Sequence, residues 1–253
     1  MKRLDGRCIM IVGSGAGIGA ATARRLAAEG AKVALSEVNI QHAEAIAEEI
    51  KAAGGKAEAY GCDVTSEESI ASFFDKAVSD FGGLDGIHIN AADTAIAVRD
   101  TNVTTVPMDV FDQTIAVNLR GHFLCTRYAI PLLLERGAGS IVYTSSRGAL
   151  AADVARVSYA VSKSGLHALM RHVALTWGRS GIRANVVAPG LILTQALRDA
   201  VSPEFIEERI RITPNKRLGE PDDVAGSVAF LMSDDADYVN GQILSVDGGT
   251  TMR

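Results

Sequence analysis

A glycine-rich segment near the N-terminus places the strongest constraint on how this 253-residue chain can fold. The segment Gly13-Ser14-Gly15-Ala16-Gly17-Ile18-Gly19 follows the apolar run Cys8–Val12 and precedes residues 20–27, whose alanine-rich composition favours a helix. This order predicts a buried strand, a tight turn and a helix, which together begin a dinucleotide-binding βαβ unit. Glycines permit the turn and let the backbone approach a pyrophosphate. The N–H groups and the positive dipole end of the helix then suit the phosphates.

Short apolar runs alternate with helical stretches along the rest of the chain, which predicts a parallel sheet with helices on both faces. We expect further strands over 32–36, 57–62, 86–90, 140–144, 183–187 and 242–246. Helices are expected over 41–53, 70–81, 111–135 and 157–178, with a capping box at 65–68 and another helix starting at Pro221. The sequence contains no repeat or Pro/Ser-rich linker. The prediction is one α/β domain over 1–253, a Rossmann fold with a doubly wound, seven-stranded sheet.

Two long segments interrupt this alternation after predicted strands, at 93–106 and 191–221. Open α/β sheets bind ligands beyond the carboxyl ends of their strands. We therefore expect both segments to border the substrate, with 191–221 as a lid that contains a short helix after Ser202-Pro203.

Composition and charge exclude several classes of partner. The formal net charge is −5 and no basic cluster occurs, which argues against nucleic acid and against anionic membrane surfaces. The dispersed Cys8, Cys62 and Cys125 predict neither a disulfide nor a metal site. No run of about 20 apolar residues suggests a membrane span. The uncharged stretch 8–23 superficially resembles a signal peptide, but Asp5, Arg7 and its four glycines favour a cytoplasmic protein.

Acidic residues at two predicted strand ends indicate which nucleotide binds. Glu37 stands 24 positions after Gly13, where a carboxylate accepts hydrogen bonds from ribose hydroxyls and repels a 2′-phosphate. Ser14, Val38 and Asn39 offer no compensating cation, so NAD is favoured over NADP. Asp63 and Val64 end the third strand and are expected beside the adenine. The alternatives are a solvated strand end for Glu37 and a helix start for Asp63. No GxxxxGK[ST] phosphate loop occurs, so an ATPase is not predicted.

Tyr159 and Lys163 are four positions apart and therefore share one face of a predicted helix. A cation beside a tyrosine lowers the pKa of the phenol from about 10. Such a tyrosine can exchange a proton with an alcohol or a carbonyl. Ser146 follows the fifth strand and is expected to donate to the same substrate oxygen, with Ser145 as the competitor. Neither serine lies in a GxSxG elbow, so acyl transfer is not predicted.

The combination of these motifs resembles the short-chain dehydrogenase/reductase family, and the resemblance extends over essentially the whole chain. It rests on Gly13, Gly17 and Gly19 and on Asp63, Asn118, Ser146, Tyr159, Lys163, Pro189-Gly190 and Thr194. The resemblance implies that Tyr159 is the general acid/base, that Lys163 holds the ribose and lowers the Tyr159 pKa, and that Ser146 orients the carbonyl. It implies a water at Asn118 that links Lys163 to solvent. Ile192 and Thr194 would hold the nicotinamide carboxamide. The remaining cofactor contacts are expected at Ser14, Ile18, Asn90 and Pro189.

The chain departs from the family pattern at three positions: Val12 replaces Thr, Ile89 replaces Asn and Ala92 replaces Gly. The proton-transfer residues are unaffected. The sequence therefore predicts an NAD-dependent oxidoreductase that interconverts a secondary alcohol and a ketone. A non-catalytic NAD-binding sensor is the alternative, although a sensor does not need all four catalytic residues. A sugar-nucleotide epimerase would require a larger substrate domain.

Apolar residues near the proposed site suggest an alicyclic or otherwise apolar small-molecule substrate. They are Ile96, Val98, Leu193, Leu197 and Phe205, with Ala149, Leu150, Asp153 and Val154 between Ser146 and Tyr159. The predicted helices 111–135 and 157–178 carry little charge on any face. Helices of this kind need cover on more than one side, so we expect a homotetramer or homodimer.

Overall fold

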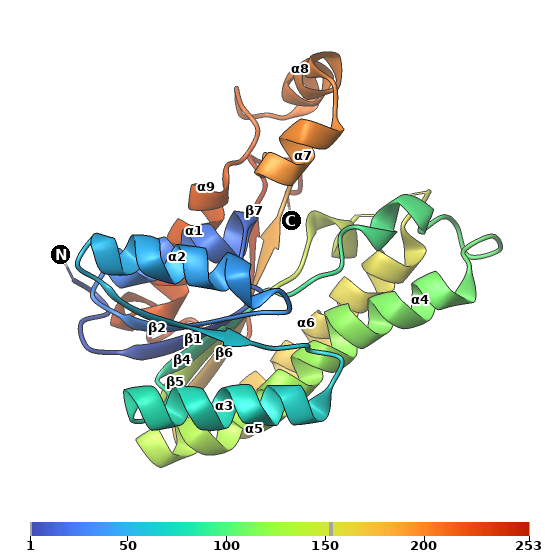
Figure 1. Cartoon of the computed structure of the whole chain (residues 1–253). Helices are drawn as coiled ribbons and strands as arrows, with labels where there is room; N and C mark the ends of the chain where they lie inside the picture. The colour runs from blue at the N-terminus through green and yellow to red at the C-terminus, as the bar shows by residue number, and fades with distance from the viewer. Residues whose placement is uncertain (1, 152–153, 253) are drawn as a thin grey trace.

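A seven-stranded parallel sheet with the order β3-β2-β1-β4-β5-β6-β7 forms the centre of the computed structural model, which describes residues 2–151 and 154–252 (Figure 1). The strands are β1 (Cys8–Val12), β2 (Lys32–Glu37), β3 (Lys56–Gly61), β4 (Gly86–Ile89), β5 (Gly139–Thr144), β6 (Ile182–Pro189) and β7 (Ile243–Val246). Every neighbouring pair is parallel. The predicted doubly wound α/β sheet is confirmed.

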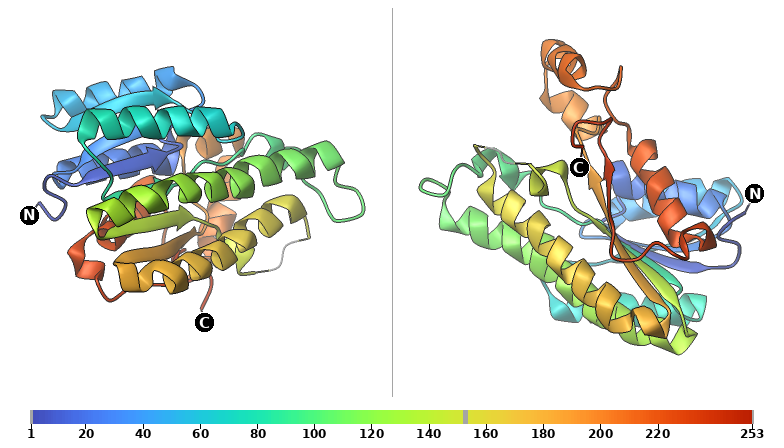
Figure 2. Two further views of the ribbon diagram at one scale, coloured as in Figure 1. Left: turned by 90° about the horizontal axis from the view of Figure 1, so that it is seen from below. Right: turned by 180° about the vertical axis from the view of Figure 1, so that it is seen from behind.

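Helices cover both faces of the sheet and make two separate apolar layers (Figures 1 and 2). One layer contains α1 (Gly17–Ala28), α2 (Ile40–Ala52) and α9 (Pro221–Met232); the other contains α3 (Glu67–Phe81), α4 (Met108–Ile115), α5 (His122–Arg136) and α6 (Val157–Trp177). Because side chains alternate along a strand, Ile9 and Ile11 of β1 pack in the first layer, while Met10 and Val12 pack in the second. The order of elements thus buries both faces of every central strand.

The chain winds outward from β1 to β3 and then returns to β4 on the other side of β1, so the direction of winding reverses between β1 and β4. In open α/β sheets, ligands bind at such a reversal, outside the carboxyl ends of the strands. Gly13 follows β1 there and Asn90 follows β4, and Asn90 Nδ2 donates to Gly13 O at 2.9 Å. The fold therefore places the glycine loop at the crevice.

Two short helices, α7 (Gln195–Ala200) and α8 (Pro203–Ile212), stand beyond the carboxyl edge of the sheet (Figure 1). Both lie in the segment 191–221. Ser202 caps α8, as expected, because its side chain accepts from Phe205 N. The sequence did not predict α7, which Thr194 caps by accepting from Leu197 N.

Local details differ from the sequence prediction at two helices. The expected helix 111–135 begins at Met108, is interrupted by π-helical turns at Ala116–Gly121, and continues through Pro131 to Arg136. The expected capping box at 65–68 is wrong, because Ser66 caps α3 by accepting from Ser69 N at 3.2 Å. Within the ranges that the structure describes, no helix has the length and apolar character needed to cross a membrane.

Candidate active site

Two glycines of the loop after β1 are required by close approaches of the backbone. Gly13 has φ +80°, and a Cβ on it would lie 2.7 Å from Ala91 Cα. A Cβ on Gly19 would lie 1.9 Å from Gly13 O. Helix α1 starts at Gly17 with no side-chain cap and no acidic residue in its first turn. Its first N–H groups therefore remain available for a phosphate, and the loop fits the pyrophosphate of a dinucleotide.

Two other residues of this region, Ser14 and Glu37, face in different directions. Ser14 is fully buried, and its hydroxyl donates to Ser36 O at 3.2 Å, which directs it into the protein. The Glu37 carboxylate lies against the glycine loop, where its Oε2 accepts from Gly15 N at 3.1 Å. Its Oε1 accepts from Val38 N at 2.9 Å. Glu37 is thus fixed at the loop and is not a freely solvated strand end.

Asp63 and Val64 lie after β3, next to the start of α3. The Asp63 carboxylate accepts from Thr65 N at 2.9 Å and from Thr65 Oγ1 at 2.7 Å, which stabilises the turn before the helix. Val64 is buried, and a Cβ on Gly121 would lie 2.8 Å from its Cβ. Asp63 therefore has the helix-start role that was expected of it, and its side chain remains exposed after the end of β3.

The segment after β6 returns across the carboxyl edge toward the glycine loop. Pro189 ends β6, and Ile192 then forms a parallel bridge with Gly219. Leu193 N donates to Gly219 O at 2.7 Å. The Thr194 methyl carbon would lie 3.1 Å from a Cβ on Gly17, so Thr194 borders the N-terminus of α1. This contact joins the predicted nicotinamide segment to the predicted phosphate loop.

Tyr159, Lys163 and Ser146 meet at the carboxyl end of β5. Lys163 is 1% exposed, its Nζ donates to Thr144 O at 2.9 Å, and it lies 5.7 Å from the centroid of the Tyr159 ring. Ser146 Oγ accepts from Gly148 N at 3.0 Å. Ser146 also hydrogen-bonds the Tyr159 side chain, an interaction that lowers the Tyr159 pKa. Helix α6 and strand β5 thus bring the three predicted groups together.

The pKa values of this group differ from the sequence expectation. Burial raises the pKa of Tyr159 above 10, and the Ser146 hydrogen bond and the Arg156 charge only oppose this effect. Burial also lowers the pKa of Lys163 to about 7. The expectation that Lys163 lowers the Tyr159 pKa is not met, because Lys163 has lost much of its charge near pH 7 and its amine bonds Thr144 O. Tyr159 is consequently a neutral proton donor at pH 7.

Ser145 and Ser146 have different environments, which distinguishes their roles. Ser145 is 2% exposed, and its Oγ donates to Lys163 O at 3.1 Å and lies 2.8 Å from His167 Nε2. Ser146 is half-buried and next to Tyr159. The Ser145 hydroxyl therefore supports α6, while Ser146 is the serine that contacts the Tyr159 side chain.

Asn118 lies in the π-helical turns between α4 and α5, and such turns occur often at functional sites. It is fully buried, and its Oδ1 accepts from Asp93 N at 3.1 Å. Its Nδ2 lies 3.5 Å from Ser162 Oγ on α6, one residue before Lys163. The widened helix therefore brings Asn118 to the catalytic helix, a detail that a continuous-helix prediction does not contain.

The sequence reasoning missed Asp100, which holds the N-terminus of α6. Asp100 is 3% exposed, and its carboxylate accepts from Ser158 N at 3.1 Å, Ser158 Oγ at 2.9 Å and Tyr159 N at 2.8 Å. Its carbonyl accepts from Arg156 N at 2.9 Å. Because Asp100 and Tyr159 are 59 positions apart, no local pattern in the sequence indicates this contact.

Two fully buried histidines, His88 and His122, surround Lys163 and are neutral. Burial, assisted by the charge of Lys163, lowers the pKa of each to about 3. His88 Nε2 lies 2.7 Å from Thr144 Oγ1, and His122 Nε2 lies 2.8 Å from Ala91 O. His122 is therefore close enough to Lys163 to feel its charge. No three His, Cys, Asp or Glu side chains are grouped to hold a metal ion in the described part of the chain.

The predicted apolar wall is uneven. Leu193 is 8% exposed, whereas Val98 and Val154 are 88% and 91% exposed. Asp153 lies outside the described residues. The exposed members lie on segments that border the carboxyl edge, where an apolar substrate would cover them.

Comparisons with known proteins agree with this geometry. A family model described as Enoyl-(Acyl carrier protein) reductase matches residues 12–251. The 7alpha-hydroxysteroid dehydrogenase of Escherichia coli (strain K12) is 37% identical over 247 residues, covering 98% of this chain and 95% of its own length. Levodione reductase of Leifsonia aquatica is 36% identical over 256 residues, covering 98% and 95%.

Among solved structures, a 7α-hydroxysteroid dehydrogenase complexed with NADH and 7-oxo glycochenodeoxycholic acid superimposes with a TM-score of 0.92. It is 36% identical in sequence, and the match covers 99% of this chain and 96% of that chain. The sheet order, the glycine loop and the Tyr159–Lys163 helix are thus accompanied by full-length similarity to dehydrogenases and reductases. The chain belongs to the short-chain dehydrogenase/reductase family and is an oxidoreductase.

Proposed function

We propose that the protein interconverts a secondary alcohol and a ketone with NAD(H), and that Tyr159 is the general acid/base. One observation carries the proposal: Ser146 after β5, Tyr159 and Lys163 on α6 and Asn118 in the π-helical turns occupy one buried neighbourhood at the carboxyl edge of the sheet. Nothing in a nucleotide sensor requires this arrangement.

Each residue has a role that follows from its chemistry. Bound NAD(H) supplies the hydride transfer. The N-terminus of α1 would hold the phosphates, and Lys163, whose Nζ lies 5.7 Å from the centroid of the Tyr159 ring, would hold the nicotinamide ribose. In the direction of ketone reduction, the neutral Tyr159 hydroxyl donates its proton to the substrate oxygen, while Ser146 Oγ donates a hydrogen bond to the same oxygen. Asn118 positions a water that returns a proton from solvent toward Lys163.

Substitutions at the site test these roles. Tyr159→Phe removes the hydroxyl and keeps the ring, so we expect nearly complete loss of kcat with NADH binding retained. Ser146→Ala is expected to lower kcat by orders of magnitude, and Ser145→Ala is the matched control with a far smaller loss. Substantial residual turnover in Tyr159→Phe would remove it from the mechanism. A wild-type chain that binds NADH but turns over no member of a panel of alcohols and ketones would instead be a sensor.

The position of Glu37 favours NAD over NADP. Its carboxylate is held at the glycine loop by Gly15 N and forms no ion pair with a basic side chain in the described ranges. A 2′-phosphate would meet an uncompensated negative charge there, whereas ribose hydroxyls would meet an acceptor. The measurement is kcat/KM for both cofactors, in the wild type and in Glu37→Ala. A tenfold preference of the wild type for NADP contradicts the proposal.

The substrate class that fits best is an apolar cyclic alcohol or ketone. The relatives named above are a hydroxysteroid dehydrogenase and levodione reductase, and segment 191–221, our proposed lid, contains the apolar residues Leu193, Leu197 and Phe205. Turnover of a steroid ketone and of smaller cyclic ketones, compared with linear ketones of equal carbon number, tests this class. Equal kcat/KM for linear and cyclic ketones argues against it.

We also infer that the chain assembles as a homodimer or homotetramer through α5 and α6. Both helices expose large apolar side chains: Phe123 (51%) and Leu134 (40%) on α5, and Val161 (46%) and Leu175 (87%) on α6. An isolated chain would leave this apolar surface in water. Light scattering that gives the mass of one 26.6 kDa chain at micromolar concentration refutes the assembly.

A further inference from the structure

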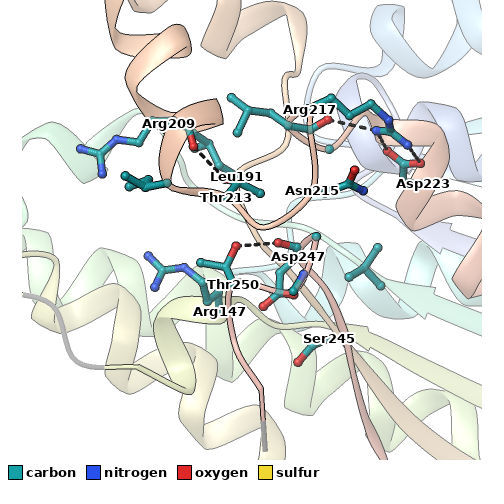
Figure 3. A pocket seen from close by; sticks show the side chains of 16 residues that line it. Arg147, Leu191, Arg209, Thr213, Asn215, Arg217, Asp223, Ser245, Asp247 and Thr250 are labelled. Atoms are coloured by element: carbon teal, nitrogen blue, oxygen red, sulfur yellow. Dashed lines mark hydrogen bonds and ion pairs between the residues drawn. The ribbon is translucent and has the colours of Figure 1, made fainter.

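A pocket of about 290 Å³ lies beside the catalytic crevice, between α8, the segment 213–219 and the end of β7 (Figure 3). Its volume is at the lower end of the range of about 300–1,000 Å³ that is typical of small-molecule sites. Two of its lining residues adjoin the site described above: Arg147 follows Ser146, and Leu191 follows Gly190. The pocket thus adjoins the site described above and is lined in part by segment 191–221, the proposed lid.

The acidic residues that line the pocket are already engaged. Arg217 and Asp223 form a two-pronged ion pair, with distances of 2.6 and 2.7 Å. The Asp247 carboxylate is turned toward the backbone, where Oδ1 accepts from Gly249 N at 3.0 Å and Oδ2 from Thr251 N at 2.9 Å. Asp223 is therefore paired with Arg217, whereas Asp247 keeps its negative charge and is held by backbone donors, so the charged lining of three arginines and two aspartates carries a net charge of +1.

The two remaining charged residues, Arg147 and Arg209, lack such partners. Neither guanidinium forms an ion pair with any carboxylate in the residues that the structure describes. Arg209 Nε is buried and has no hydrogen-bond acceptor, and its guanidinium stacks over the Phe205 ring at 4.8 Å. Figure 3 shows both side chains at one end of the pocket, away from the Arg217–Asp223 pair. A buried donor without an acceptor is destabilising.

We propose that this pocket binds a small anionic group of the carboxylate or phosphate class between Arg147 and Arg209. A guanidinium presents parallel N–H donors that match either group, and an anion bound here would give Arg147 and Arg209 the charged partner that both lack among the described residues. The bound anion could be a free acid or an acidic group on the substrate. The proposal that it belongs to the substrate rests on the proposed function, whereas the binding of a free acid does not.

Direct binding tests the site without reference to catalysis. Succinate and inorganic phosphate are titrated into the wild type by calorimetry at low ionic strength. We expect saturable binding of at least one anion, weakened at least tenfold in Arg147→Gln and in Arg209→Gln. Arg209→Lys keeps the charge and retains part of the affinity. Arg211→Gln is the matched control, because Arg211 is exposed on the same helix and does not line the pocket.

Kinetics then separates the two sources. A cyclic ketone acid is compared with its neutral amide as substrates. If the acid has at least a tenfold higher kcat/KM, and both Gln variants abolish the difference, the anion belongs to the substrate. If the free anions bind but acid and amide react equally, the anion is a separate ligand. The proposal is overturned if no anion binds and acid and amide react equally, or if the Gln variants behave as the wild type. The proposed function survives that outcome as long as the ketone is reduced and Tyr159→Phe is inactive.

Discussion

The N-terminus of the catalytic helix α6 depends on Asp100, and removal of its carboxylate should be costly. The first residue before the helix, Arg156, has φ +59° and provides no side-chain cap. Asp100 satisfies the N–H groups of Ser158 and Tyr159 instead, and Thr101 O accepts from Val157 N at 3.3 Å. A carboxylate here also interacts favourably with the positive end of the helix dipole.

Asp100→Ala leaves two backbone donors of α6 without an acceptor. At about 1–3 kcal/mol for each buried unsatisfied group, we expect a loss of roughly 2–6 kcal/mol in the free energy of unfolding. At about 2–4 °C per kcal/mol for a chain of this size, that loss corresponds to a decrease of roughly 4–24 °C in Tm. Asp100→Asn keeps one acceptor oxygen and should lose about half as much. Because Tyr159 N is one of the donors, kcat should fall in Asp100→Ala while the KM for the cofactor changes little.

The assay is thermal and urea denaturation followed by circular dichroism, together with steady-state kinetics. Asp109→Ala is the matched control. Its ion pair with Arg99 at 2.8 Å joins two side chains that are more than half exposed, and such pairs contribute about 0–1 kcal/mol. The reasoning fails if Asp100→Ala and Asp109→Ala have the same Tm within about 1 °C, since a three-bond cap cannot be as weak as a surface pair.

Three further predictions concern pH, the glycine loop and assembly. The pKa of Lys163 in the folded chain is about 7, below the ordinary 10.5, so between these pH values the unfolded chain binds more protons and the free energy of unfolding rises with pH. Relative to Lys163→Met, the wild type should gain up to about 5 kcal/mol in the free energy of unfolding from pH 7 to 10.5. If the difference between the two proteins in denaturation does not depend on pH, the burial of this amine is contradicted. Gly19→Ala places a Cβ 1.9 Å from Gly13 O and should weaken NADH binding at least tenfold in a fluorescence titration. Gly61→Ala is the control, because a Cβ at Gly61 meets no atom within 4 Å. Equal Kd values of the two variants for NADH refute the close packing at Gly19. Leu175→Glu, at a side chain 87% exposed on α6, should reduce the assembly mass in light scattering, and Val103→Glu, 77% exposed on a loop, is the control; an unchanged mass excludes Leu175 from the interface.

Fold class was predictable, and the proposed catalytic residues could be selected, because their signals are local. The alternation of apolar runs and helical stretches specified a parallel sheet, and the glycine spacing specified the turn after β1. Tyr159 and Lys163 lie one helical turn apart, so their proximity follows from helix geometry alone. The sequence favoured Ser146 over Ser145, and the structure adds the physical reason, because only packing shows that Ser145 is bound to His167 and Lys163 O.

Tertiary structure alone decided the features that depend on distant residues. The contact of Asp100 with α6 and the π-helical turns at Asn118 arise from segments that meet only after the sheet has formed. The pKa of Lys163 could not follow from sequence spacing, because spacing suggests a charged neighbour for Tyr159, whereas burial removes the solvent that stabilises that charge. The two arginines without carboxylate partners are likewise 62 positions apart and are brought to one pocket by the return of the chain after β6. The sequence by itself thus determined the fold class and the position of the glycine loop, since both rest on short-range patterns, and it predicted the proton-transfer residues through a family resemblance. Protonation states, helix capping and the pocket beside α8 depend on desolvation and long-range contacts, which exist only in the folded chain.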